Sequence, residues 1–386
     1  MTLLLSENVI IVRPVATART AADRPSPARG FHRVRVARVI RETEDSRSFV
    51  LDVPEDLRPA FSYRAGQFCT FRVHVDGATH HRCYSMSSAP EVDPDLTVTV
   101  KRVPGGAVSN WLVDRVAPGD ELEVTQPAGV FQLTRSDDPL VAFAAGSGIT
   151  PIMSLVREAL TTTERHVRLL YANRDRASTI FFDELARLER ESDGRLVVQH
   201  RWDVDHGFVD VASVSAFLDA HLAEAACDGE LYVCGPTPFM DVVEVAALAA
   251  GVPAARIHIE RFTPSSDDLP FADDVAVEPV DVGSPAAEPP APPKGTKVTV
   301  EVEGRSGTTE HRAGTTLLQT ARQLGLDPPY SCEAGNCATC MARLVEGTVD
   351  MHVNDALTDA EVEEGWVLTC QSVPTSPTVH VVYGYD

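Results

Sequence analysis

Four cysteines in the last quarter of the sequence constrain its fold more than any other feature. Cys332, Cys337 and Cys340 lie within nine residues, and Cys370 follows after 29 more. This C-x4-C-x2-C…C spacing suits a [2Fe–2S] cluster held by three thiolates on one loop and a fourth from a distant strand. The loop also contains Gly335 and other small residues, which let backbone N–H groups point at sulfur. Structural zinc usually takes two C-x2-C pairs, so zinc and incidental thiols are the alternatives.

A proline-rich, acidic stretch divides the chain. Residues 263–294 hold eight of the 27 prolines and seven acidic residues against one basic residue. Such a segment cannot bury enough apolar surface to fold alone, and as a flexible coil it would span roughly 30 Å. It is predicted to be a linker, followed by a domain at 295–386 with a strand, a helix and the cysteine loop. Residues 1–28 are predicted to be a loosely held extension.

Two patterns precede the linker. Residues 29–135 contain short alternating strand candidates separated by turn signals such as Asp76-Gly77, which is typical of an antiparallel β-barrel or sandwich. Residues 138–262 alternate apolar strand candidates with helical segments, which predicts a parallel, doubly wound α/β sheet. The fold class expected is therefore multidomain.

Composition excludes several classes of protein. The net charge is −22, from 56 acidic and 34 basic residues, whereas nucleic-acid and anionic-membrane binders carry a basic footprint. No apolar run approaches the ~18–20 residues that cross a bilayer, and the first residues lack the basic start of a signal peptide. A cytoplasmic protein without membrane or nucleic-acid partners is expected. The remaining cysteines are scattered, which argues against a disulfide framework; they are Cys69, Cys83, Cys227 and Cys234.

The segment RCYSMSSAP in the barrel region carries chemistry of a definite kind. Arg82 can clamp a phosphate, the ring of Tyr84 can stack on a flat heteroaromatic, and the Ser85 hydroxyl can bond a ring nitrogen. Downstream, Gly105-Gly106 leads to a helix expected to begin near Ser109, and a glycine turn before a helix N-terminus is an anion site. The alternative is an arginine–tyrosine surface pair and a capped helix.

The second domain carries two further motifs. In AAGSGITPIMSL, Gly146 and Gly148 allow close approach of the backbone to a pyrophosphate before a helix expected to open at Pro151. The segment lacks the third glycine of the usual dinucleotide fingerprint. Near the end of the domain, Cys234-Gly235-Pro236 follows a strand, at the sheet edge where α/β proteins bind ligands. Cys234 alone is more often a small buried hydrophobe.

The order of these motifs resembles the ferredoxin–NADP⁺ reductase superfamily, and 295–386 resembles a plant-type ferredoxin domain of α+β, β-grasp fold. Together they resemble three-domain reductase components of multicomponent oxygenases, such as those of 3-ketosteroid 9α-hydroxylase and phenylacetyl-CoA epoxidase. The resemblance implies that FAD lies at the barrel motif and that Cys234 and Glu260 lie beside the nicotinamide. It implies catalytic roles for Ser85, Cys234, Glu260 and for Phe262, which would cover the flavin face. The cofactor-binding set is Arg82, Tyr84, Ser85, Gly105, Gly106, Val108, Ser109, Gly146, Gly148, Ile149, Thr150, Pro151, Arg174, Cys234, Gly235 and Pro236.

The expected electron path runs from NAD(P)H through FAD and the [2Fe–2S] cluster to a terminal oxygenase of Rieske or di-iron type. A flavin must stand between a two-electron donor and a one-electron centre. The oxygenase would act on a steroid or an aromatic ring, and the reductase would be a monomer. Rival hypotheses are a general NAD(P)H:acceptor reductase and an iron–sulfur redox sensor. Arg174 and Arg176 could hold a 2′-phosphate, but Asp175 between them could repel it, and the resemblance favours NADH.

Overall fold

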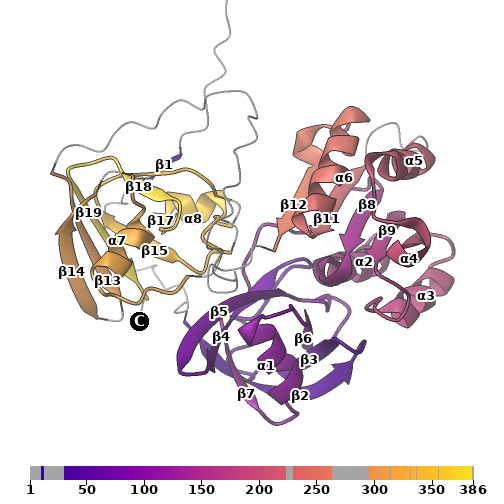
Figure 1. Ribbon diagram of the computed structural model, residues 1–386, viewed down its shortest axis with the longest axis horizontal. Helices are drawn as coiled ribbons and strands as arrows, with labels where there is room; N and C mark the ends of the chain where they lie inside the picture. The colour runs from indigo at the N-terminus through magenta and orange to yellow at the C-terminus, as the bar shows by residue number, and fades with distance from the viewer. Residues whose placement is uncertain are drawn as a thin grey trace, which may run out of the picture. The chain divides into compact units, whose positions relative to one another are not determined.

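The computed structural model describes residues 10–12, 30–222, 229–262 and 295–384, apart from residues 303, 313, 331, 336 and 355. The predicted linker 263–294 and Cys227 lie outside the described residues. The chain divides into two compact units, one of Phe31–Phe262 and one that joins Met1–Gly30 to Thr263–Asp386. Figure 1 shows their elements. In the described part, no helix is long and apolar enough to cross a membrane. The boundaries proposed for three domains stay predictions.

The first sheet of the larger unit is antiparallel and follows the alternation in the sequence. In β2, Val34 and Val36 are fully buried while the neighbouring arginines point outward. A bridge between Met86 and Val98 brings the two ends of the sheet together, which confirms the predicted barrel. The sheet order is β5-β4-β7-β2-β3-β6. Its strands are β2 (His32–Arg41), β3 (Ser46–Asp52), β4 (Phe68–Val75), β5 (Ala78–Ser85), β6 (Leu96–Lys101) and β7 (Glu121–Val124).

The only helix assigned within the described barrel residues, α1 (Ala107–Arg115), begins two residues before the position expected from the sequence. Gly105 has a positive φ of 75°, and Gly106 is the N-cap without a side-chain cap. The Ser109 hydroxyl accepts a hydrogen bond from the Val103 backbone N–H at 3.1 Å. Ser109 therefore closes the turn from within the first turn of the helix.

The second sheet of this unit is parallel, as predicted, with order β10-β9-β8-β11-β12. Val141 and Phe143 of β8 face one core with helices α5 and α6, whereas Ala142 and Ala144 face the other core with α2 and α3. Helices on both faces make the sheet doubly wound. The strands are β8 (Leu140–Ala145), β9 (Val167–Asn173), β10 (Leu196–Trp202), β11 (Glu230–Gly235) and β12 (Ile257–Arg261). The helices are α2 (Ile149–Thr162), α3 (Phe182–Glu191), α4 (Asp203–His206), α5 (Val211–Leu222) and α6 (Thr237–Ala249), with short 3-10 turns at Gly146–Gly148 and Ala254–Arg256.

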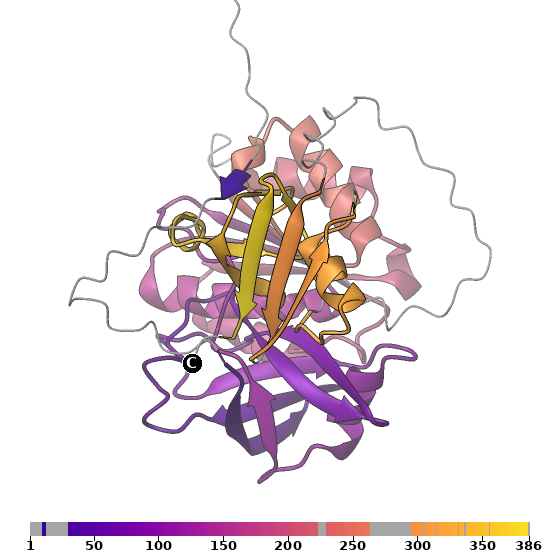
Figure 2. The ribbon, with the colours of Figure 1, turned by 90° about the vertical axis from the view of Figure 1, so that its left-hand side faces the viewer.

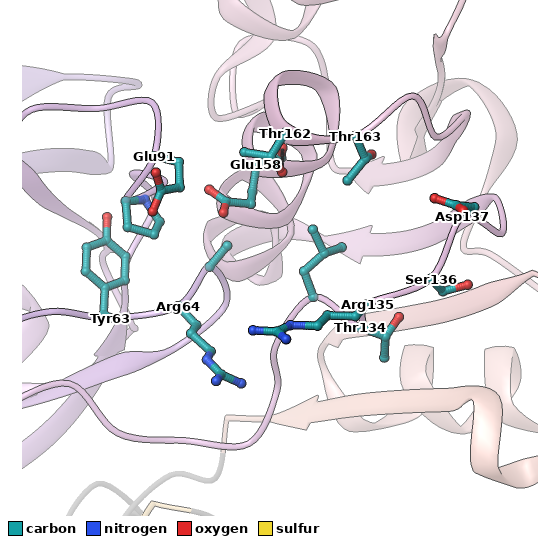
Figure 3. Close-up of a pocket in the computed structure, with 13 residues that line it drawn as sticks. Tyr63, Arg64, Glu91, Thr134, Arg135, Ser136, Asp137, Glu158, Thr162 and Thr163 are labelled. Atoms are coloured by element: carbon teal, nitrogen blue, oxygen red, sulfur yellow. Dashed lines mark hydrogen bonds between the residues drawn. The ribbon is translucent and has the colours of Figure 1, made fainter.

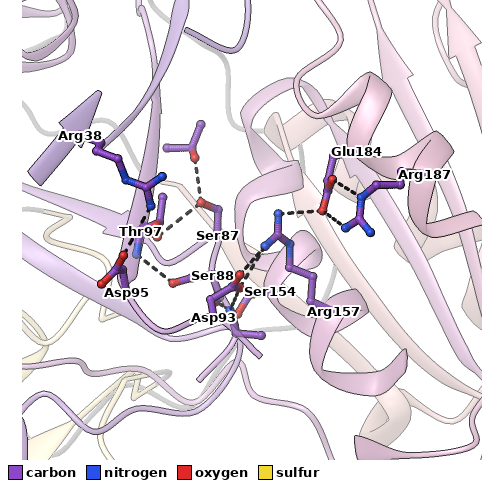
Figure 4. A network of polar contacts seen from close by, with 12 residues as sticks. Arg38, Ser87, Ser88, Asp93, Asp95, Thr97, Ser154, Arg157, Glu184 and Arg187 are labelled. Carbon is purple, nitrogen blue, oxygen red and sulfur yellow. Dashed lines mark hydrogen bonds and ion pairs between the residues drawn. The ribbon is translucent and has the colours of Figure 1, made fainter. Parts of the chain in front are cut away.

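Helix α2 ties the parallel sheet to the barrel (Figure 4). The Ser154 hydroxyl donates to the Ser88 carbonyl at 2.6 Å. The Arg157 guanidinium bonds both carboxylate oxygens of Asp93, at 2.8 and 3.0 Å, and lies 3.2 Å from the carboxylate of Glu184 in α3. Side chains of one helix thus link the barrel and the parallel sheet.

The smaller unit is α+β. A mixed sheet of order β14-β13-β19-β15-β17 packs against α7 (Leu317–Gln323), whose N-terminus carries a capping box of Thr316 and Gln319. A second sheet has the order β1-β16-β18, and its strand β1 (Ile10–Val12) lies in the segment that the sequence indicates is loosely held. The remaining elements are β13 (Lys297–Val302), β14 (Arg305–Glu310), β15 (Met341–Glu346), β16 (Val349–Met351), β17 (Trp366–Leu368), β18 (Ser372–Pro374), β19 (Thr378–Tyr383) and α8 (Asp359–Glu363).

Candidate functional site

The glycine motifs of the parallel sheet meet at its topological switch point. The chain leaves β8 towards β9 on one side and returns through β11 on the other. The 3-10 turn Gly146–Gly148 follows β8, while Gly235 ends β11 and Pro236 follows it, so both segments lie at the carboxyl edge between adjacent strands. In open α/β sheets this crevice binds ligands. The turn also makes α2 begin at Ile149, two residues before the expected Pro151.

Gly148 allows a close approach of two backbone segments. A Cβ atom there would lie 2.7 Å from the backbone nitrogen of Gly235 and closer still to the Cys234 carbonyl. The φ of Gly148 is −61°, so it is space rather than backbone conformation that requires glycine. The glycine turn and the first residues of α2, Ile149 and Thr150, therefore lie close to the end of β11.

Cys234 and Glu260, which the resemblance assigns to the nicotinamide, lie on neighbouring strands. They are register partners in the parallel ladder of β11 and β12. Cys234 is fully buried, and burial, followed by the charge of Glu260, raises the pKa of its thiol well above the ordinary value. The side chain is therefore a neutral thiol and not a thiolate nucleophile.

A charged cluster that the sequence did not reveal joins the barrel to this crevice. A Cβ atom on Gly146 would lie 3.8 Å from Nζ of Lys101, which is the last residue of β6. Burial lowers the pKa of the Lys101 ammonium, and Asp45 and Asp175 oppose this effect. Arg174, assigned from sequence to the cofactor, lies 3.1 Å from the Asp45 carboxylate. The one signal for Lys101 in the sequence is that it is one of three lysines.

The barrel motif places its hydroxyl in a position suited to a ligand. Ser85 is 2% exposed, and among the described residues its Oγ has no hydrogen-bond partner. A buried hydroxyl without a partner costs roughly 1–3 kcal/mol, and a flavin ring atom would satisfy it. Ser85 ends β5 opposite Phe68, so the barrel sheet fixes the position of its backbone.

The other two residues of the motif are partly engaged within the protein. Arg82 donates from Nη1 to the His81 carbonyl at 2.8 Å. Tyr84 packs against the barrel core and meets Phe71 edge to face, with ring centroids 5.3 Å apart. Val108 and Ser109 are buried, so their side chains support α1, and its uncapped Gly106 N-terminus is the part that could meet a phosphate.

A cavity at the junction of barrel and parallel sheet lies away from the glycine turn. It has a volume of about 490 Å³ and is lined by charged and hydroxyl side chains, among them Arg64, Arg135 and Glu158 (Figure 3). Glu158 and Thr162 lie near the carboxyl end of α2, whereas the glycine turn precedes its amino end. The 14 residues of α2 put about 20 Å between the two.

The four cysteines of the smaller unit are buried. Hydrogen bonds join Cys332 to Cys337 and Cys340 to Cys370, and charge interactions also connect Cys337 with Cys340 and Cys332 with Cys370. Cys332 donates from its backbone N–H to Sγ of Cys337 at 3.4 Å, and the Ala334 N–H donates to Sγ of Cys332 at 3.4 Å. The Cys340 thiol donates to Cys370, and this bond lowers the pKa of Cys370, helped by the Gly335 backbone amide. Backbone N–H groups do point at sulfur, as expected.

This arrangement fits a two-iron cluster better than a single ion. A tetrahedral zinc ion needs four ligands around one point, whereas a [2Fe–2S] cluster takes two protein ligands on each of two irons. Pairs of Cys332 with Cys337, and of Cys340 with Cys370, match the second requirement.

Comparisons with known proteins agree with this geometry. Residues 33–133 match an oxidoreductase FAD-binding domain, 143–244 an oxidoreductase NAD-binding domain, and 300–375 a 2Fe-2S iron-sulfur cluster binding domain. The ferredoxin reductase component of 3-ketosteroid-9-alpha-monooxygenase from Rhodococcus rhodochrous is 39% identical over 90% of this chain and 95% of its own length. One of the subunits of 1,2-phenylacetyl-CoA epoxidase from Escherichia coli is 34% identical over 92% of this chain and 98% of its own length.

A solved structure has the same layout. Phthalate dioxygenase reductase, a modular protein for electron transfer from pyridine nucleotides to [2Fe–2S], is 25% identical, with a TM-score of 0.54 over 92% of this chain and 98% of its own. The chain therefore has an FAD-binding, an NAD-binding and a [2Fe–2S]-binding domain. The chain belongs to the family of flavin- and [2Fe–2S]-containing, NAD(P)H-dependent reductase components of multicomponent oxygenases.

Proposed function

We propose that this chain takes electrons from NADH in preference to NADPH and delivers them, one at a time, to a Rieske-type oxygenase that hydroxylates a steroid. The carrying observation is the paired set of buried cysteines on a chain that also holds a switch-point crevice. A cluster held by the cysteines passes on one electron at a time, whereas NAD(P)H in the crevice delivers two electrons as a hydride. Bound FAD can accept the two electrons together and release them singly. The steroid follows from the ketosteroid reductase components, which are 39–40% identical, against 30–32% for the glycine betaine reductase subunits.

The roles of individual residues are part of this proposal. The Ser85 hydroxyl contacts the flavin ring and orients the nicotinamide, Arg82 and the N-terminus of α1 hold phosphates, and Tyr84 flanks the flavin. Gly148 lets the glycine turn lie against the end of β11, so that the dinucleotide reaches the N-terminus of α2. Phe262, at 39% exposure, covers the flavin face.

Lys101 from the barrel and Arg174 from the loop after β9 supply positive charge to the nicotinamide dinucleotide. Their neighbours Asp45 and Asp175 leave this cluster with little net charge. A cluster of that kind can bond a pyrophosphate, but it offers no surplus of positive charge for a further phosphate.

Preference for NADH is supported by the contacts that the charged side chains of the loop after β9 already make. Arg174 lies beside Asp45, and the Arg176 guanidinium lies 4.3 Å from the centre of the Phe182 ring. Asp175 accepts from the Ser178 backbone N–H at 2.8 Å, which lowers the pKa of its carboxyl. The loop therefore presents a fixed anion between two engaged arginines, and this repels a 2′-phosphate.

A steady-state comparison tests this preference. We expect kcat/KM for NADH to exceed that for NADPH, and Asp175→Ser to narrow the ratio by improving NADPH. Asp219→Ser is a matched control, because Asp219 is an exposed carboxylate on helix α5 and lies outside this loop. Equal use of both nucleotides by the unmodified protein would overturn the assignment.

Reconstitution tests the oxygenase partner. The purified protein, NADH and the oxygenase component of a 3-ketosteroid monooxygenase are expected to give hydroxylated steroid with NADH consumed in equal amount. Glycine betaine and phenylacetyl-CoA systems serve as the comparison. A Cys370→Ser variant should keep FAD and ferricyanide reduction but lose cytochrome c reduction and hydroxylation. Cytochrome c and quinone turnover without support of any oxygenase would favour the general reductase, and zinc in place of iron and labile sulfide would contradict the cluster.

A further inference from the structure

The amino-terminal segment forms a strand on the iron–sulfur domain. Strand β1 pairs antiparallel with β16, with Ile10 opposite Met351, Ile11 opposite Asp350 and Val12 opposite Val349. The indigo strand lies beside the yellow part of the chain in both ribbon views (Figures 1 and 2). The other edge of β16 is taken by β18, so β1 adds a third strand to a sheet next to the cysteine loop. Val353, two residues after β16, meets Gly335 of that loop.

The hydrogen-bond pattern of β16 identifies the amides that β1 covers. His352 donates from its backbone N–H to the Gln371 carbonyl, and Thr375 donates to the Thr348 carbonyl. Residues 348, 350 and 352 therefore direct their backbone groups towards β18. Because alternate residues of a strand point their N–H and C=O groups to opposite sides, Val349 and Met351 direct theirs towards β1. By the same alternation Ile10 and Val12 bond β16, and the N–H of Ile11 points away.

We propose that the pairing of β1 with β16 is a releasable second tether between the iron–sulfur domain and the flavin barrel. The proposal goes beyond the oxygenase partner and does not depend on it. Residues 263–294 already connect the domain from one end, through 32 residues. Docked β1 connects it from the other, because only the 17 residues 13–29 separate Val12 from Gly30.

The length of this tether determines how often the flavin and the cluster meet. Fully extended, 17 residues reach at most about 60 Å, whereas 32 residues reach about 110 Å. The effective concentration of tethered partners falls roughly as the −3/2 power of tether length, so the shorter connection raises the encounter frequency of flavin and cluster about two- to threefold. A pairing of three residues is weak, and an effective concentration in the millimolar range is what keeps it formed. The same weakness lets it open when the domain must turn to an external acceptor.

Amide hydrogen exchange on the full, cofactor-loaded protein tests the pairing. Val12→Pro removes a donor from the ladder with β16, and we expect the amides of Val349 and Met351 to exchange at least tenfold faster. Ile11→Pro is the matched control, because it deletes an N–H that points away from β16. The amides of Asp350 and His352, which face β18, should not change. Deletion of residues 2–12 should reproduce Val12→Pro, and unchanged exchange at Val349 and Met351 in both variants would overturn the pairing.

Single-turnover kinetics test the tether. After anaerobic mixing with NADH, one electron leaves the reduced flavin and enters the cluster, which is followed by the cluster absorbance. We expect Val12→Pro and the deletion to slow this phase two- to threefold relative to Ile11→Pro, with flavin reduction unchanged. If the amides of Val349 and Met351 exchange faster in Val12→Pro but the cluster is reduced at an unaltered rate, then β1 does not act as a tether. No oxygenase is present in either experiment, so their failure is distinct from failure of the proposed function.

Discussion

Replacement of Gly148 by alanine should disable the nicotinamide site and leave the flavin site intact. The new Cβ would lie 2.7 Å from the Gly235 nitrogen, against an ordinary contact of at least 3.4 Å, and the clash with the Cys234 carbonyl is worse. Both obstacles are backbone atoms of β11, a strand held on each side by β8 and β12. The glycine turn must therefore shift by 0.7 Å or more.

Two magnitudes follow from this shift. Overpacking a close-packed core costs typically 1–3 kcal/mol of folding free energy, and a displacement of about 1 Å in a positioning element can cost about a hundredfold in rate. We expect flavin reduction by NADH to slow by one to two powers of ten, with FAD content unchanged because Ser85 lies on another sheet. The measurement is anaerobic stopped-flow of flavin bleaching, together with FAD content and a thermal melt.

The control for this experiment is Gly30→Ala. At Gly30 no atom lies within 4 Å of the added Cβ, and no left-handed backbone is required. If Gly148→Ala reduces flavin at the unmodified rate, the close approach to β11 does not position the dinucleotide. If it loses FAD, the separation of the two sites is wrong.

Further changes give outcomes of different kinds. Ser85→Ala should keep FAD but slow hydride transfer tens-fold. Arg82→Ala should weaken FAD retention by one to two powers of ten, which is the equivalent of a charge-assisted bond worth ~1.5–3 kcal/mol. Stopped-flow kinetics and flavin content, measured on the same samples, distinguish the two effects. Arg157→Ala should lower the free energy of unfolding of the 31–262 unit by about 1.5–3 kcal/mol, because Asp93 loses its two hydrogen bonds. Denaturant titration measures this free energy, and Arg58→Ala, at an exposed arginine, is the control. A hydrogen bond from Arg187, opposed by burial and helped by the charge of Arg157, lowers the pKa of Glu184, so its ionised form stabilises the fold at neutral pH. That contribution is lost as the pH falls through the lowered pKa of this carboxyl. Glu184→Gln should flatten the acid side of the stability curve, and an unchanged curve would contradict the assignment.

The sequence predicts those features that depend on local chemistry. Alternation in HRVRV identifies β2, because each valine faces a core and each arginine faces solvent. The cysteine loop is predicted with its thiols and its sulfur-directed amides, because turn geometry and ligand spacing are set within nine residues. The crevice is predicted from Gly146, Gly148 and Gly235, since strand ends in parallel sheets meet at one edge.

Features set by tertiary contacts escape such analysis. Lys101 lies beside the Gly146–Gly148 turn because β6 ends next to that turn. The two are 45 positions apart in the sequence, so no local pattern predicts their contact. The starts of α1 and α2 are two residues early because glycine turns, which carry no side-chain cap, continue directly into helix. Strand β1 is missed because three apolar residues gain their hydrogen bonds from β16, more than 300 positions away.

Helix α2 connects the glycine turn to the barrel segment that carries the Ser85 hydroxyl. Its amino end continues from the turn that presses on β11, and one turn later Ser154 bonds the carbonyl of Ser88. Ser88 is three residues after Ser85, so the hydroxyl and the turn are joined through a single helix and a short buried segment. Arg157 repeats the connection one turn further on, to Asp93. Movement of the parallel sheet against the barrel must therefore break hydrogen bonds at α2 before it can change the separation of Ser85 and the glycine turn.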